Sequence, residues 1–89
     1  MPTRTVAVAS AVGLHARPAA VLTSAVNDCG LDVSLALGRG EPVDAGSILE
    51  VMALGAKHGD LVTLSAAGDG ADAVLDGLVA LLARDLDAE

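Results

Sequence analysis

The strongest constraint on the fold of this chain is a strict alternation of side chains between Leu31 and Leu37. Every second residue in this segment is a valine or a leucine, and the residues between them are polar or small. A period of two is typical of a strand that buries one face and exposes the other. The chain is therefore predicted to contain a sheet, and the pattern contradicts an all-helical bundle.

Six further elements are predicted around this strand. Thr5 to Ala9 also alternates and predicts a first strand. From Ala16 to Cys29 the apolar spacing is helical, Pro18 is compatible with a first turn, and Gly30 stands where a glycine ends a helix. The remaining elements are an edge strand from Glu41 to Asp44, a short helix from Ser47 to Gly55, a strand from Leu61 to Ala66 and a helix opened by Gly68-Asp69-Gly70.

The resulting order, β-α-β-β-α-β-α, predicts an α+β open-faced sandwich in which the two longer helices cover one face of the sheet. A chain of 89 residues is expected to form one domain, spanning residues 1–89. The chain has no Phe, Trp or Tyr, so its core has to be built from Ala, Val, Leu and Ile.

Charge and composition exclude several classes of function. Twelve acidic against five basic residues give a net charge of −7, which argues against a nucleic-acid binder and against docking on anionic lipid. No apolar run approaches the ~20 residues of a membrane helix, so a cytoplasmic protein without membrane insertion is expected. Cys29 is the only cysteine, and it shows no metal-ligand spacing with His15 or His58.

The chemistry of the chain is expected at His15, directly before the first predicted helix. The first N–H groups of a helix lack backbone partners, so those of Ala16 and Arg17 can donate to an anion beside His15. The Arg17 guanidinium can add a forked contact to phosphate oxygens. Gly13 allows either a close backbone approach or a positive φ.

A nucleophile, an anion cradle and a charge clamp are the parts needed to accept and donate a phosphoryl group. The same residues also fit a plain alternative, in which His15 caps a helix beside a surface arginine. Anion sites at helix starts are common, so the physical chemistry of the segment alone leaves both interpretations open.

Two blocks of sequence decide between them. Gly-Leu-His-Ala-Arg-Pro-Ala, from Gly13 to Ala19, resembles the active-centre motif of the HPr family, the histidine-containing phosphocarriers of the bacterial phosphoenolpyruvate:sugar phosphotransferase system. Ser47 to Ala56 is similar to the second block of that family, and the length and element order also match. The resemblance implies a four-stranded antiparallel sheet with three helices. It also implies that enzyme I phosphorylates His15 on Nδ1, using phosphoenolpyruvate, and that the group passes to sugar-specific enzyme IIA.

The resemblance points to further residues. Ser47 corresponds to a serine that a dedicated kinase phosphorylates in some bacteria, although an N-cap with Glu50 reaching back explains Ser-x-x-Glu equally well. The family's docking surface for enzyme I and enzyme IIA is expected at Ala20, Ile48, Leu49 and Met52. Many relatives carry lysines on the first two helices, whereas Arg17 is the only basic residue near this site, so electrostatic steering is expected to be weaker.

The sequence leaves three alternative functions open. A closely related one is a phosphocarrier of the regulatory, nitrogen-linked branch. An acyl carrier protein is also small and acidic, with a modifiable serine at a helix start, but Ser47 is not preceded by Asp. The third alternative is an α+β domain in which the match to the active-centre motif is accidental. None of them requires a metal or an organic cofactor, and the favoured function is a monomeric covalent relay that does not turn over substrate alone.

Overall fold

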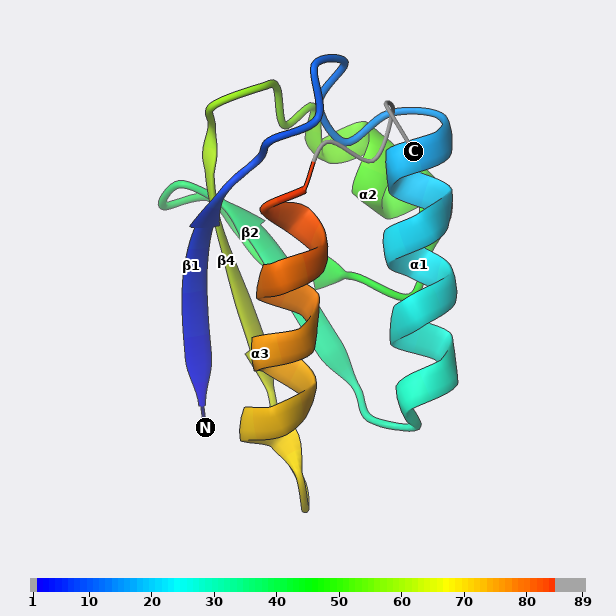
Figure 1. Cartoon of the computed structure of the whole chain (residues 1–89), viewed down its shortest axis with the longest axis vertical. Helices are drawn as coiled ribbons and strands as arrows, with labels where there is room; N and C mark the ends of the chain where they lie inside the picture. Colours follow the sequence, from blue (N-terminus) through cyan, green and yellow to red (C-terminus); the bar gives the residue numbers. More distant parts are fainter. Residues whose placement is uncertain (1, 85–89) are drawn as a thin grey trace.

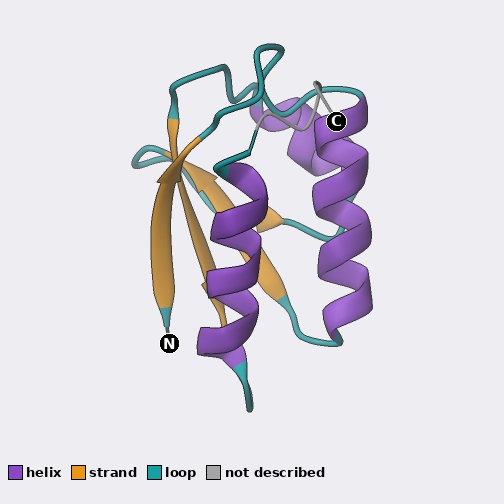
Figure 2. Ribbon diagram, in the orientation of Figure 1, coloured by secondary structure: helices purple, strands orange, loops and turns teal. Residues whose placement is uncertain are grey.

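The computed structural model of the chain describes residues 2–84, and these form seven elements in the predicted order (Figures 1 and 2). The elements are β1 (Thr3–Ala7), α1 (Arg17–Cys29), β2 (Val33–Leu37), β3 (Val43–Asp44), α2 (Ile48–Leu54), β4 (Leu61–Ala66) and α3 (Ala71–Leu82). The three helices lie on one side of a single sheet, whose other face is uncovered. The α+β open-faced sandwich is confirmed.

The sheet is antiparallel with the strand order β1-β4-β2-β3. The predicted edge strand from Glu41 to Asp44 is too long, because only Val43 and Asp44 pair with β2. Pro42 has no N–H to donate to a ladder, so pairing starts after it. The bounds of the first strand are also wrong by two residues, because the N–H of Ala9 donates to the carbonyl of Leu82 at the end of α3 instead of to β4.

The core lies between the sheet and the helices. α1 packs on α2 and α3, and α3 packs on β1 and β4. The predicted helical stripe of α1 is buried at Ala19, Leu22 and Val26, and Cys29 at its end is half-buried. The buried apolar side chains are aliphatic throughout, as a chain without aromatic residues requires. Burial of these side chains is the main favourable contribution to the fold.

Arg4 fastens β1 to α3. Its Nη2 lies 3.0 Å from Oδ1 of Asp72, and its Nε lies 3.0 Å from Oδ1 of Asp76. The hydrogen bond with Asp72, followed by that with Asp76, raises the pKa of Arg4 above its ordinary value. Asp72 and Asp76 stand between the buried residues of α3. Both are exposed, but only the tertiary structure brings a cation from the far end of the chain to them.

Residues 2–84 contain neither a candidate membrane-spanning helix nor a candidate metal-binding group. No helix in this range is long and apolar enough to cross a membrane. Within the same range, no group of three or more His, Cys, Asp or Glu side chains is placed to hold a metal ion.

Candidate functional site

His15 lies in the loop between β1 and α1. Figure 1 shows this loop at the upper end of the molecule. Its neighbours on the N-terminal side are buried: Leu14 is 1% exposed, and Gly13 is buried as well. His15 itself is exposed. The buried Leu14 therefore anchors the loop in the core, and the next residue presents its imidazole to solvent.

Gly13 is the point where this loop meets the segment after α2. Its φ is +74°, and a Cβ at this position would lie 2.3 Å from the carbonyl oxygen of Ala56. The N–H of Leu14 donates to the same oxygen at 2.9 Å. A close approach and a positive φ were the two alternatives predicted for Gly13, and both are found. Only a residue without a side chain fits this contact.

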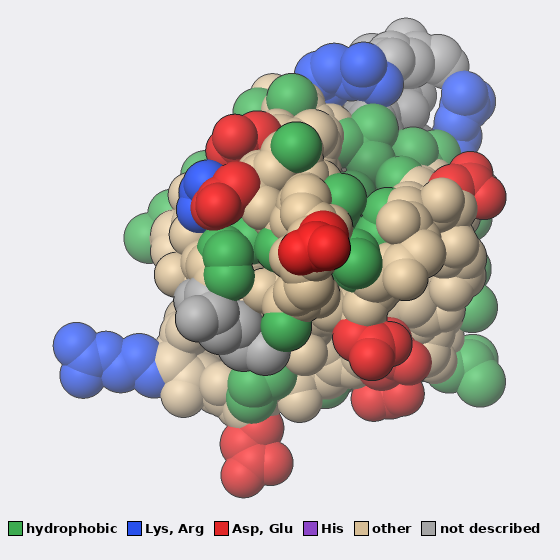
Figure 3. All heavy atoms as spheres, turned by 90° about the horizontal axis from the view of Figure 1, so that it is seen from below, with side chains coloured by type: hydrophobic (Ala, Val, Ile, Leu, Met, Phe, Trp, Pro, Cys, Tyr) green, Lys and Arg blue, Asp and Glu red, His purple; other side chains and the backbone are tan. Residues whose placement is uncertain are grey.

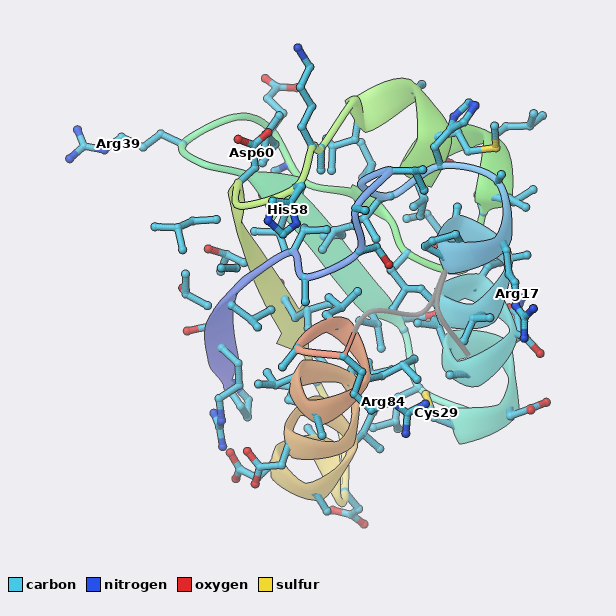
Figure 4. All side chains as sticks on the ribbon, turned by 45° about the horizontal axis from the view of Figure 1, so that its top comes forward. Arg17, Cys29, Arg39, His58, Asp60 and Arg84 are labelled. Carbon is cyan, nitrogen blue, oxygen red and sulfur yellow. The ribbon has the colours of Figure 1, made fainter. Side chains whose placement is uncertain are left out.

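The beginning of the loop is held by the turn that precedes β4. The N–H of Gly59 donates to the carbonyl of Val8 at 2.8 Å, and Nδ1 of His58 lies 3.1 Å from the carbonyl oxygen of Ala9. In Figure 4 the labelled His58 and Asp60 lie on the side of the loop away from α1. His58 and Ala9 are 49 positions apart, so no local pattern around His58 predicts this contact.

α1 begins one residue later than predicted, at Arg17. Ala16 is its N-cap, with φ 52° and ψ −122°, and it is the only non-glycine residue in the described range with a positive φ. Such a conformation costs about 1–3 kcal/mol and is concentrated at functional sites. Alanine carries no sequence signal for it, so the strain next to His15 could be recognised only in three dimensions.

The start of α1 leaves backbone donors beside His15. No side chain caps this helix, and no acidic residue lies in its first turn. Within residues 2–84, no hydrogen bond engages the N–H of Ala16 or Arg17. Arg17 is exposed, and Figure 4 shows its side chain on the outer side of α1. Two backbone donors and one exposed guanidinium are thus within a few residues of the imidazole, which suits an anion on His15.

Ser47 caps α2, but the predicted capping box is incomplete. Its Oγ accepts a hydrogen bond from the N–H of Glu50 at 3.4 Å. The Glu50 carboxylate does not reach back to Ser47; its Oε1 accepts from the N–H of Asp44 at 3.3 Å. The N–H of Ser47 donates to the carbonyl of Asp44 instead. The N–H of Ser47 was expected to donate to the Glu50 carboxylate. It instead forms the hydrogen bond of a tight turn before the helix.

The four residues expected to dock partners differ in how far their side chains are exposed. Leu49 is 78% exposed, Ile48 is 38% exposed and Ala20 is exposed, whereas Met52 is half-buried against the core. Sequence analysis missed Val12, which is 51% exposed in the His15 loop. Val12, Ile48 and Leu49 are three of the four large hydrophobic side chains exposed among residues 2–84. Apolar exposure is thus concentrated in the loop and in the first turn of α2.

The comparisons with known proteins agree with this geometry. A family model described as the PTS HPr component phosphorylation site matches residues 2–84. The chain belongs to the HPr family. The phosphocarrier protein HPr of Streptomyces coelicolor is 41% identical over 87 residues, which cover 98% of this chain and 94% of that protein. The one from Haloferax volcanii is 44% identical over 82 residues, which cover 89% and 90%.

A solved structure of the HPr family supports the fold directly. HPr-C-His from Thermoanaerobacter tengcongensis superposes with a TM-score of 0.90 at 31% sequence identity, covering 100% of this chain and 99% of that one. The chain is therefore a phosphocarrier of the phosphotransferase system. The acyl carrier alternative, which needs an all-helical bundle, is overturned by the four-stranded sheet.

Proposed function

We propose that His15 is the phosphorylated residue of this HPr. It accepts a phosphoryl group on Nδ1 from phosphorylated enzyme I, which draws on phosphoenolpyruvate, and passes it to enzyme IIA in sugar uptake. The observation that carries this proposal is the position of His15, exposed and directly before the uncapped N-terminus of α1. The relay operates in the cytoplasm with a single copy of the chain.

The transfer requires positioning and charge stabilisation, with little covalent help from other groups. Neutral Nδ1 of His15 attacks the phosphorus in line, and a nitrogen–phosphorus bond forms. The bond between phosphorus and the donor breaks, and its electron pair remains on the donor group. The N–H groups of Ala16 and Arg17 and the Arg17 guanidinium offset the negative charge on the phosphoryl oxygens. Transfer to enzyme IIA repeats these events in the reverse sense.

The docking surface in this proposal consists of Ala20, Ile48, Leu49 and Met52. Leu49 is the most exposed large hydrophobic residue among residues 2–84 and leads the contact, while Met52 contributes only the part of its side chain that leaves the core. Ser47 acts as the cap of α2. A regulatory phosphate on Ser47 would stand three residues from Glu50 in the first turn of that helix, and the two negative charges would repel each other.

The decisive experiment is a labelled transfer assay. The protein is incubated with cognate enzyme I and labelled phosphoenolpyruvate, and acid-labile label is counted on the wild type, on His15→Ala and on His58→Ala. We expect label on the wild type and on His58→Ala, and none on His15→Ala. Label that persists after His15→Ala contradicts the proposal. A panel of enzyme IIA proteins, including one from the nitrogen-linked branch, then identifies the branch by which acceptor takes the group.

A further inference from the structure

The segment after α2 places a second cationic residue, Lys57, against the His15 loop. A Cβ on Gly13 would lie 2.8 Å from the α-carbon of Lys57, so the two backbones are in direct contact. Gly13 and His15 are two residues apart, which spans at most about 7 Å of chain. A lysine carries its ammonium on a flexible four-carbon stem, so the Lys57 charge can reach an anion held on His15.

The backbone of Lys57 is held in place while its side chain is exposed. Its N–H donates to Oδ2 of Asp60 at 2.9 Å, and its carbonyl accepts from the N–H of Asp60 at 2.9 Å. Ala56, directly before it, is 4% exposed and bonded to Leu14. In the described residues, the Lys57 ammonium forms no ion pair, since the Asp60 carboxylate engages the backbone instead.

Two of the other cationic side chains are held or directed away from the His15 loop. Arg4 is bound to Asp72 and Asp76, and Arg39 projects from the β2–β3 turn away from the helices (Figure 4). Acidic side chains are scattered over the opposite end of the molecule, where α1 ends and α3 begins (Figure 3). Figure 4 shows the Arg17 side chain on the outer side of α1, whereas the turn that carries Lys57 contacts the loop at Gly13.

We infer that Lys57 is a second cationic group of the phosphohistidine site, which stabilises the doubly charged phosphoryl group on His15 from the turn that contacts Gly13. This inference rests on the phosphorylation of His15 proposed above. Lys57 lies outside both sequence motifs. The segment around His15 supplies only one charged side chain, that of Arg17, to stabilise the phosphoryl group, and Lys57 adds a second. The nearest titratable groups on the same turn are His58 and Asp60, and both are left unchanged in the test.

The test measures the ionisation of the phosphoryl group itself. Wild type, Lys57→Gln, Lys57→Arg and Arg39→Gln are phosphorylated with enzyme I and phosphoenolpyruvate, and the phosphorus NMR shift of the phosphohistidine is followed against pH. When the flexible lysine stem brings its ammonium to about 7 Å from the phosphoryl group in water, the Coulomb attraction favours the dianion, and removal of the ammonium then raises the phosphoryl pKa by roughly 0.3–0.5 unit. We expect this rise in Lys57→Gln, no rise in Lys57→Arg or Arg39→Gln, and its loss near 1 M salt.

The outcomes separate this inference from the proposed function. A Lys57→Gln protein that is phosphorylated on His15 and titrates like the wild type overturns the role of Lys57 and leaves the relay intact. An equal rise in Arg39→Gln also overturns it, because the effect would then belong to the net charge of the molecule. Failure of His15 to take up label in the wild type removes the proposed function and this inference together. Circular dichroism of each variant checks that the fold is retained.

Discussion

Gly13 and Ala56 are in contact so close that a methyl group between them would lie 2.3 Å from the Ala56 carbonyl oxygen. This contact joins the loop that presents His15 to the segment that follows α2, the helix that carries Ile48 and Leu49. One backbone junction therefore holds both the surface expected to bind partners and the residue expected to receive the phosphoryl group. The hydrogen bond from Leu14 to the same carbonyl closes it.

Substitution of Gly13 tests this junction. Gly13→Ala is expected to lower the free energy of unfolding by more than the roughly 1 kcal/mol that a positive φ costs an alanine, because the Ala56 backbone also has to move. The matched control is Gly30→Ala, which has nearly the same φ, +76°, but open space around the new methyl group. Denaturant unfolding of both variants gives the comparison, and equal losses would contradict the junction. Phosphorylation by enzyme I is expected to slow in Gly13→Ala alone.

The docking surface is tested at Leu49. Leu49→Asp places a carboxylate in an apolar interface, where burial without a partner costs about 1–3 kcal/mol, so KM for transfer from enzyme I is expected to rise about tenfold. Leu61→Asp is the matched control, since Leu61 is 58% exposed and lies in β4, away from α2. Initial rates over a range of protein concentrations measure both. An unchanged KM in Leu49→Asp would show that the docking surface lies elsewhere.

The cap of α2 predicts a stability effect at Ser47. Ser47→Ala is expected to lower the free energy of unfolding by about 0.5–1 kcal/mol, at the low end for an N-cap because the hydrogen bond to the Glu50 N–H is long, at 3.4 Å. Phosphorylation of His15 should be unchanged in this variant. Mass spectrometry of the protein from cells grown on a preferred sugar is expected to find Ser47 unmodified; a phosphate there would give the residue a regulatory role in addition to the cap.

Gly77 offers a stabilising substitution. It lies in the middle of α3, is exposed, and has open space where a Cβ would be added. Gly77→Ala is therefore expected to raise the free energy of unfolding by about 0.5–1 kcal/mol, the difference in helix propensity between the two residues. Gly70→Ala, at the N-cap of the same helix with φ +81°, should have the opposite sign. Thermal unfolding of the two variants measures both, and a lower Tm in Gly77→Ala would contradict the prediction.

The type and order of every element followed from local pattern. Alternation marked β1 and β2, helical spacing marked α1 and α3, and glycines marked the ends of α1 and α2. The bounds of β4 were predicted correctly, and its two neighbours together pair with its whole length, β1 with Leu61 to Ser65 and β2 with Val62 to Ala66. The bounds of β1 and β3 were not, because a residue from α3 and a proline decide where their pairing stops. The strand predicted from Leu31 also begins two residues later, at Val33, where pairing with the end of β4 at Ala66 begins.

The residues of the candidate site were predicted from the sequence, but the contacts that hold them in place were found only in the structure. His15, Arg17 and the glycine before them lie within five residues, so a helix start and an adjacent nucleophile could be recognised from spacing alone. The contacts of Gly13 with Ala56, of His58 with Ala9 and of Arg4 with Asp72 join residues more than 40 positions apart. No local pattern encodes such pairs, because they depend on how the elements pack. The sequence by itself determined which residue can carry a phosphoryl group; the tertiary structure decided what holds that residue in place, since those partners meet only after the chain has folded.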